Sequence, residues 1–368
     1  MIRTPLAIRR AGCFFLFVLK FKVENGQFLT NRQSRTQSKV RPWGNCFKVG
    51  PWIAECCVKI HSMTIDEKKQ AFNRTLFSWH KDHYRDMPWR NTRDPYHILI
   101  SEIMLQQTQV DRVRTKYTDF LKRFPTVRVL AKAPLGEVLR AWSGLGYNRR
   151  ARYLHDCAKK IVHEYSGKFP NDLEELKRLP GIGLSTAGAL LAFSFGEDEP
   201  MIDTNIRRIL VRVFFGGKRS KKIRGRTLGI NSSRSDLVSF PHVPSDKGLY
   251  IFAKSLIPKG KGRIWNYAML DLGATSCTAR NHSDRCPLMR LHGEVGDFRY
   301  KKPQKKFHGS RRFYRGKILS LLTERKRVAP LQLGKAVALP TSALRDILRD
   351  LKRERLVVSS RGKIMLPK

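Results

Sequence analysis

The stretch LPGIGLSTAGALLAF, residues 179–193, decides how the middle of this chain folds. Pro180, Gly181 and Gly183 form a short turn between an amphipathic segment and an apolar one. Glycines allow positive φ and carry no Cβ, so a phosphate can approach the backbone N–H groups that begin the second segment. The stretch therefore predicts two helices joined by a phosphate-binding turn, and the alternative is a plain helix connection.

Helical spacing continues on both sides of this turn. From Ile65 onward apolar residues recur every three to four positions, as in ISEIMLQQTQVDRVRTKYTDFLKRF, residues 100–124. Proline and glycine interrupt the pattern often enough to predict about seven short helices over residues 65–215. Two more helices are predicted over residues 249–257 and 261–273. We expect an all-α domain over residues 63–298.

The composition points to a polyanionic partner. The chain has 368 residues with 73 Lys and Arg against 30 Asp and Glu, a formal net charge of +43. A hydrophobic content of 41% excludes a wholly disordered protein. Such an excess of like charge disfavours a compact state unless a polyanion neutralises it, and nucleic acid is the commonest intracellular polyanion. An acidic ligand or a membrane surface is the weaker alternative.

Most of this charge lies outside the predicted helical domain core. Residues 1–62 carry +9, residues 216–248 carry +6 and residues 299–368 carry +17. We expect residues 1–62 to be a basic, disordered N-terminal extension and residues 216–248 to be a basic surface insertion in the domain. Residues 299–310 are predicted to form a basic linker.

Residues 311–368 are predicted to form a small α+β module. Three helical segments are followed by the alternating stretch VVSSRGKIMLP, which predicts a β-hairpin. This order resembles a winged helix, and its positive charge favours contact with DNA or RNA. A packing or protein-interaction module is the alternative.

The cysteines and the N-terminus bear on the compartment. Seven cysteines without a repeated spacing argue against a secreted disulfide framework, so we expect an intracellular protein, and the positive charge favours a location with nucleic acid. The apolar run near the N-terminus is closed by Lys20 and Lys22 and is too short to span a bilayer. An organellar transit peptide within residues 1–62 is one alternative, and translation from Met63 is another.

Two carboxylates stand out. Glu102 is the one charged residue in an otherwise apolar, hydroxyl-bearing or amide-bearing helical stretch. Asp203 stands at the start of the helical segment TNIRRIL, where it can serve as an N-cap without any further function. Taken alone, Glu102 is equally a solvated surface residue, so neither residue identifies a site by itself.

Six segments together resemble the adenine-specific mismatch DNA glycosylases of the helix–hairpin–helix base-excision repair superfamily. They are MPWR (87–90), DPYHILISEIMLQQTQV (94–110), GLGYNRRARYL (144–154), LPGIGLSTAGA (179–189), IDTNIRRIL (202–210) and WNYAMLDLGATSCTARN (265–281). The resemblance covers roughly residues 65–290 in the family's order. It implies the helix–hairpin–helix glycosylase fold and a double-stranded DNA substrate.

The resemblance gives the two carboxylates their roles. Glu102 corresponds to the general acid and base that protonates adenine at N7, and Asp203 to the carboxylate that faces the developing oxocarbenium ion. Asn205 is implied to orient this pair. The arrangement parallels the two carboxylates of glycoside hydrolases.

Base flipping requires a wedge and a pocket. Gln107, together with Gln106, matches the family's intercalating amide, and Tyr147 matches the aromatic wedge beside the orphaned base. The pocket or its rim is implied to include Arg85, Trp89, Arg90 and Leu105. Gly181, Gly183 and Ser185 are implied to contact DNA.

Position 185 separates branches of the superfamily. Relatives that also cleave the strand carry a lysine there, whose amine forms a Schiff base with the sugar. Ser185 lacks this amine, so the resemblance implies a monofunctional enzyme that hydrolyses the bond to adenine opposite guanine or 8-oxoguanine.

The identity of the base is less firmly indicated, because Tyr267 stands where members of the family commonly carry Gln or Glu. The alternatives are a thymine or uracil mismatch glycosylase and a DNA-binding protein that has lost catalysis.

The resemblance fails at the family's iron–sulfur site. Relatives carry four cysteines spaced C-x6-C-x2-C-x5-C around a [4Fe–4S] cluster. Here Cys277 and Cys286 remain, and the fourth position falls on His292. We expect the loop 277–292 to be a degenerate remnant without a metal, and the protein to act as a monomer without a cofactor. Zinc bound by the two thiolates with His282 or His292 is the alternative.

Overall fold

The computed structural model describes residues 23–24, 27–28, 63–215, 244–279, 285–292 and 306–368. The chain divides into two units, Met1–Ala54 and Glu55–Lys368. In the first unit, β1 (Val23–Glu24) pairs antiparallel with β2 (Gln27–Phe28). The sequence predicts no strand so early in the chain. The rest of the extension over residues 1–62 and the insertion up to residue 243 lie outside the described residues.

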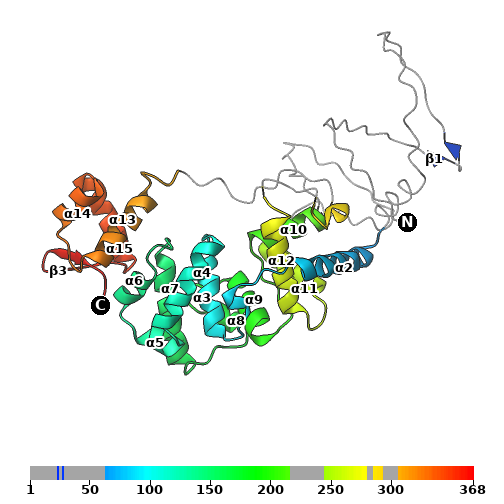
Figure 1. Ribbon diagram of the computed structural model, residues 1–368, viewed down its shortest axis with the longest axis horizontal. Helices are drawn as coiled ribbons and strands as arrows, with labels where there is room; N and C mark the ends of the chain where they lie inside the picture. Colours follow the sequence, from blue (N-terminus) through cyan, green and yellow to red (C-terminus); the bar gives the residue numbers. More distant parts are fainter. Residues whose placement is uncertain (1–22, 25–26, 29–62, 216–243, 280–284, 293–305) are drawn as a thin grey trace, which may run out of the picture. The chain divides into compact units, whose positions relative to one another are not determined.

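Helices form the part of the second unit that ends at residue 292 (Figure 1). Because the described residues of this part contain no strand, the prediction of an all-α domain is confirmed. The α-helices are α2 (Ile65–His83), α3 (Pro95–Leu105), α4 (Val110–Arg123), α5 (Val127–Lys132), α6 (Leu135–Ala141), α7 (Arg149–Glu164), α8 (Leu173–Lys177), α9 (Leu184–Leu190), α10 (Thr204–Leu210), α11 (Asp246–Leu256) and α12 (Gly262–Thr275). The 3₁₀ turns are η1 (Pro88–Arg90) and η4 (Met289–Leu291), and the π-helical turns are η2 (Leu191–Phe195) and η3 (Val211–Phe215).

The prediction of about seven helices over residues 65–215 is wrong, because two of the predicted helices are broken. The continuous helix expected over 100–124 divides into α3 and α4, since the backbone leaves helical geometry at Gln106 (ψ 109°) and becomes left-handed at Gln107 (φ 57°). The segment before Gly144 divides into α5 and α6 at Ala133 and Pro134, both of which are extended or outside helical geometry. The first break contains neither glycine nor proline, whereas the second lies at Pro134, a signal that the prediction did not use.

Local signals fix where the first long helices begin. Thr64 caps α2 by accepting a hydrogen bond from Glu67 N, and the Glu67 carboxylate accepts from Thr64 N at 2.8 Å. The two bonds form a capping box. Asp94 caps α3 by accepting from Tyr96 N at 2.8 Å, and Pro95 occupies the first helical position.

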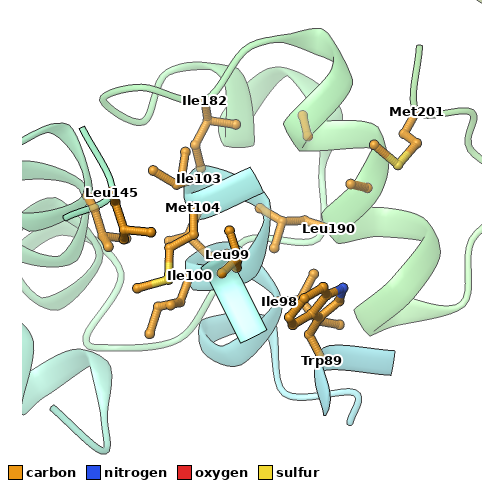
Figure 2. Packing of buried hydrophobic residues seen from close by; sticks show 14 of the residues in the cluster. Trp89, Ile98, Leu99, Ile100, Ile103, Met104, Leu145, Ile182, Leu190 and Met201 are labelled. Atoms are coloured by element: carbon orange, nitrogen blue, oxygen red, sulfur yellow. The ribbon is translucent and has the colours of Figure 1, made fainter. Parts of the chain in front are cut away.

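Helix α3 runs through the core of the domain. Seven of its side chains are buried, and Figure 2 shows Leu99, Ile100, Ile103 and Met104 among apolar side chains of the surrounding elements. Burying a large aliphatic side chain contributes roughly 1.5–3 kcal/mol, so this helix is held firmly. Glu102 is the charged residue on it, and its position is therefore fixed by the packing of its neighbours.

The turn between α8 and α9 requires glycine for steric reasons. Gly181 has φ 80°, and a Cβ at this position would lie 2.8 Å from the Cβ of Tyr153. Gly183 is the N-cap of α9, and no atom lies within 4 Å of a Cβ added there. The prediction of two helices joined by a tight glycine turn is confirmed, and the backbone at Gly183 is open to an approaching group.

The C-terminal module contains α13 (Arg311–Glu324), α14 (Pro330–Val337) and α15 (Thr341–Arg353). Strand β3 (Val358–Ser360) then pairs antiparallel with β4 (Lys363–Met365), and Val328 adds a single bridge to Ile364. Three helices followed by a hairpin confirm the predicted α+β module. No helix among the described residues is both long and apolar enough to cross a membrane.

Candidate active site

A cavity of about 560 Å³ opens beside α3, next to the N-termini of α9 and α10. Helix α12 and η1 also contribute to its walls. Ten of the predicted site residues line it: Arg85, Trp89, Arg90, Glu102, Leu105, Gln106, Gln107, Ser185, Asp203 and Asn205. Tyr147, Gly181 and Gly183 lie outside its lining. Residues separated by a hundred positions in sequence are thus brought into one cavity.

Glu102 faces this cavity and is partly buried among the side chains around it. Burial and the nearby Asp203 carboxylate, opposed by Arg90, together raise the pKa of its carboxyl to about 8. Glu102 is therefore mostly protonated at neutral pH. A neutral carboxylic acid at a cavity wall can donate a proton to a bound ligand.

Asp203 lies across the cavity at the N-terminus of α10. Its Oδ1 accepts hydrogen bonds from Asn205 N and Ile206 N, each at 2.8 Å, and its Oδ2 accepts from Asn205 Nδ2 at 3.1 Å. Burial raises the pKa of Asp203, while these bonds and Arg208 act to lower it. The N-cap prediction is confirmed, and Asn205 holds the orientation of the carboxylate.

An aromatic and cationic wall closes another side of the cavity. The rings of Tyr267 and Phe193 stack at 4.4 Å, and the guanidinium of Arg90 lies 4.5 Å from the Tyr267 ring. Arg90 donates two hydrogen bonds to the buried Asp271, at 2.7 and 2.8 Å, and His80 lies 3.1 Å from the same carboxylate. These contacts lower the pKa of Asp271 although burial acts to raise it. The stacked rings and the Arg90–Asp271 ion pair thus form one side of the cavity.

The two predicted wedge residues share an unusual backbone conformation. Gln107 has φ 57° and Tyr147 has φ 47°, both in the left-handed region that residues other than glycine rarely occupy. Both side chains are exposed. Gln107 lies at the rim of the cavity, whereas Tyr147 is on the turn that precedes α7.

The comparisons with known proteins agree with this geometry. Residues 100–229 match the model of the HhH-GPD superfamily base excision DNA repair proteins. The chain is 35% identical over 254 residues to an adenine DNA glycosylase of Mycolicibacterium smegmatis, covering 68% of this chain and 79% of that protein. The chain belongs to the adenine DNA glycosylase family.

Other relatives extend the comparison. The human adenine DNA glycosylase is 37% identical over 231 residues, which cover 60% of this chain and 39% of that protein. The chain thus spans well under two thirds of some relatives. A solved structure of a thermostable thymine-DNA glycosylase is 29% identical with a TM-score of 0.52, covering 62% of this chain and 96% of that chain. The helix–hairpin–helix glycosylase fold predicted from the six segments is confirmed.

The cysteine loop of this family member does not fit a four-cysteine cluster. A [4Fe–4S] cluster requires four thiolates, and the described residues at this place offer two, from Cys277 and Cys286. His292 lies close to them and offers a ring nitrogen in place of a thiolate. The donor set therefore differs in number and in kind from the cluster that the resemblance implies.

Sequence reasoning missed the arginines that organise the glycosylase site. Arg208 donates to Asn205 Oδ1 at 3.0 Å and to Gly273 O at 2.7 Å, which ties the N-terminus of α10 to α12. Arg150 donates to backbone carbonyls at the end of α3 and in the turn before α7. Both guanidiniums are buried in a strongly basic chain, and no pattern in the sequence separates them from its many exposed arginines.

Proposed function

We propose that this chain is a monofunctional DNA glycosylase that releases adenine mispaired with guanine or 8-oxoguanine. The observation that carries the proposal is the pair of carboxylates in one cavity. Glu102 is held mostly protonated, and Asp203 is hydrogen-bonded in a fixed orientation. Membership of the adenine DNA glycosylase family supports the same reaction.

The reaction follows from the two different carboxylates. Glu102 donates its proton to N7 of the flipped adenine, and the electron pair of the C1′–N9 bond leaves with the base. The Asp203 carboxylate stabilises the positive charge that develops on the sugar. Glu102, now ionised, accepts a proton from the water that attacks C1′, which leaves an abasic site.

Ser185 supports hydrolysis without strand cleavage. It lines the same cavity, where a lysine would offer an amine to C1′. A hydroxyl has no nitrogen and cannot form a Schiff base, so we propose that the abasic product keeps an intact backbone.

The charge distribution supports double-stranded DNA as the partner. The net charge of +43 favours binding to phosphates, and the open backbone at Gly183 offers N–H groups to one of them. We propose a monomer that acts inside the cell on its DNA, and a catalytic step that needs no iron–sulfur cluster.

The cavity in the C-terminal module is a less suitable site for this chemistry. It is larger, at about 1020 Å³, and it lies between α14 and α15. Its lining contains no Asp, Glu, His or Cys, so it offers neither a general acid nor a carboxylate. The 560 Å³ cavity of the helical domain is therefore the site of the proposed reaction.

The test uses four duplexes that carry A·G, A·8-oxoguanine, T·G or U·G pairs. We expect release of adenine from the first two and strand breaks only after treatment with alkali. Breaks confined to T·G and U·G would overturn the adenine assignment. These two duplexes are a necessary control because Tyr267 lies in the cavity wall and departs from the Gln or Glu of the family. Breaks without alkali, or covalent trapping by borohydride, would contradict the monofunctional assignment.

A further inference from the structure

Cys277, Cys286 and His292 form a compact group after the C-terminal end of α12. One ligand atom from each residue lies within 4.8 Å of the others, and Cys286 Sγ lies 3.9 Å from His292 Nε2. Both cysteines are buried. Cys277 directly follows α12, and the other two residues flank η4, so the group joins two segments of the chain.

These separations are close enough for the three ligand atoms to contract onto a single zinc ion. Zinc binds thiolate sulfur at about 2.3 Å and imidazole nitrogen at about 2.0–2.1 Å in a tetrahedron. Such a tetrahedron places two sulfurs about 3.8 Å apart and a sulfur and a nitrogen about 3.6 Å apart. The observed 3.9 Å between Cys286 Sγ and His292 Nε2 needs a contraction of only a few tenths of an ångström.

The surroundings of Cys277 suit a metal-bound thiolate. Arg212 Nη1 donates a hydrogen bond to Cys277 Sγ at 3.2 Å and another to Thr278 O at 2.8 Å. Hydrogen bonds of this kind orient ligands and stabilise the charge on metal-bound sulfur. Two thiolates and one neutral imidazole balance the charge of a divalent ion.

We propose that Cys277, Cys286 and His292 bind one Zn²⁺ ion in place of an iron–sulfur cluster. This inference replaces the sequence-based expectation of a loop without a metal, because the sequence alone did not show that His292 lies beside both thiols. It does not depend on which base the enzyme releases.

The site is connected to the catalytic cavity through one side chain. Arg208 Nε donates to Cys277 O at 2.8 Å, and Arg208 Nη2 donates to Asn205 Oδ1 at 3.0 Å. Asn205 in turn holds Asp203. Zinc therefore stabilises the segment that supports the catalytic N-cap without touching the substrate.

The test measures metal directly in the full chain, purified without chelators. Plasma mass spectrometry is expected to find about one zinc per chain and no matching iron and sulfide. Cys286→Ala and His292→Ala are expected to lower zinc affinity at least about tenfold, whereas His292→Cys, which keeps three ligands, retains the ion. Cys157→Ala and His163→Ala serve as matched controls, since Cys157 is a buried thiol and His163 an exposed imidazole, both on α7.

A second measurement does not require the variants to fold. Wild-type protein loaded with Co²⁺ is expected to show the intense visible bands of a tetrahedral site and a thiolate charge-transfer band. Absence of bound zinc, zinc that persists in both Cys286→Ala and His292→Ala, or octahedral cobalt bands would each overturn the proposal. Four irons with inorganic sulfide would overturn it as well.

Discussion

Gln107 and Tyr147 lie forty residues apart on separate turns, and the guanidinium of Arg150 holds both turns. Arg150 Nη1 donates to Gln106 O at 2.5 Å, and Nη2 donates to Gly146 O at 3.2 Å, so each bonded carbonyl belongs to the residue before a left-handed one. The guanidinium also lies 5.5 Å from the Tyr147 ring. One buried cation thus keeps two strained turns in a fixed relation, which is what a two-sided wedge in DNA requires.

The first prediction concerns this guanidinium. Arg150→Lys keeps the charge but loses the planar fork that reaches both turns, so the turns lose their fixed relation. We expect the single-turnover rate of adenine release to fall at least about tenfold, while binding to undamaged duplex at low salt is unchanged. Arg152→Lys, on the same helix, is the control and should keep its rate. Wild-type rates for Arg150→Lys would remove the wedge-positioning role.

The second prediction separates strain from function at Gln107. Gln107→Gly relieves a left-handed conformation that costs about 1–2 kcal/mol in other residues, but it removes the amide that is proposed to enter the DNA stack. The variant should be as stable as the wild type or slightly more stable in urea denaturation. Its rate of base release should nevertheless decrease about tenfold or more. A less stable variant with a normal rate would show that Gln107 is structural.

The third prediction is a pH profile. Because Glu102 must be protonated to act as an acid and its pKa is raised to about 8, the rate of base release should fall tenfold per pH unit above that value. The pKa of Asp203 is also raised by burial, so the acid side of the profile should begin above the ordinary range of Asp. Single-turnover rates between pH 5 and pH 10 check both sides. A constant rate up to pH 9.5 would exclude Glu102 as the acid.

Much of the fold is visible in the sequence because its helices obey the 3.6-residue period and its turns contain glycine or proline. Asp203 is predictable as an N-cap from its neighbours alone. The break after α3 is not predictable, because the turn there is held by hydrogen bonds from Arg150 to Gln106 O and other carbonyls, more than forty residues away. The roles of Arg150 and the buried Asp271 depend on partners far away in the sequence. The residues next to them in the chain therefore do not predict these roles.

The fourth prediction tests the packing behind the catalytic carboxylate. A Cβ added to Gly273 on α12 would lie 2.6 Å from the Cβ of Asn205, which holds Asp203. Gly273→Ala should therefore displace Asn205, lower stability by about 1–3 kcal/mol and slow base release. Gly316→Ala is the matched control, because Gly316 lies within α13 and no atom is within 4 Å of its added Cβ. A fully active Gly273→Ala variant would show that Asn205 tolerates displacement.

The fifth prediction decides what the C-terminal module contacts. Helix α15 is the third helix, the one that reads the groove in a winged helix, and Arg345, Arg349 and Lys352 are exposed on it. If the module binds DNA, replacing all three with alanine removes up to three phosphate contacts. The slope of log affinity against log salt should then become shallower by as much as about 2.7, because each contact contributes about 0.9.

Charge-conserving replacements, Arg345→Lys, Arg349→Lys and Lys352→Arg, serve as the control and should leave the slope nearly unchanged. An identical slope in the alanine variant and the wild type would assign the module to protein contacts instead, since a surface that meets no phosphate releases no counterions.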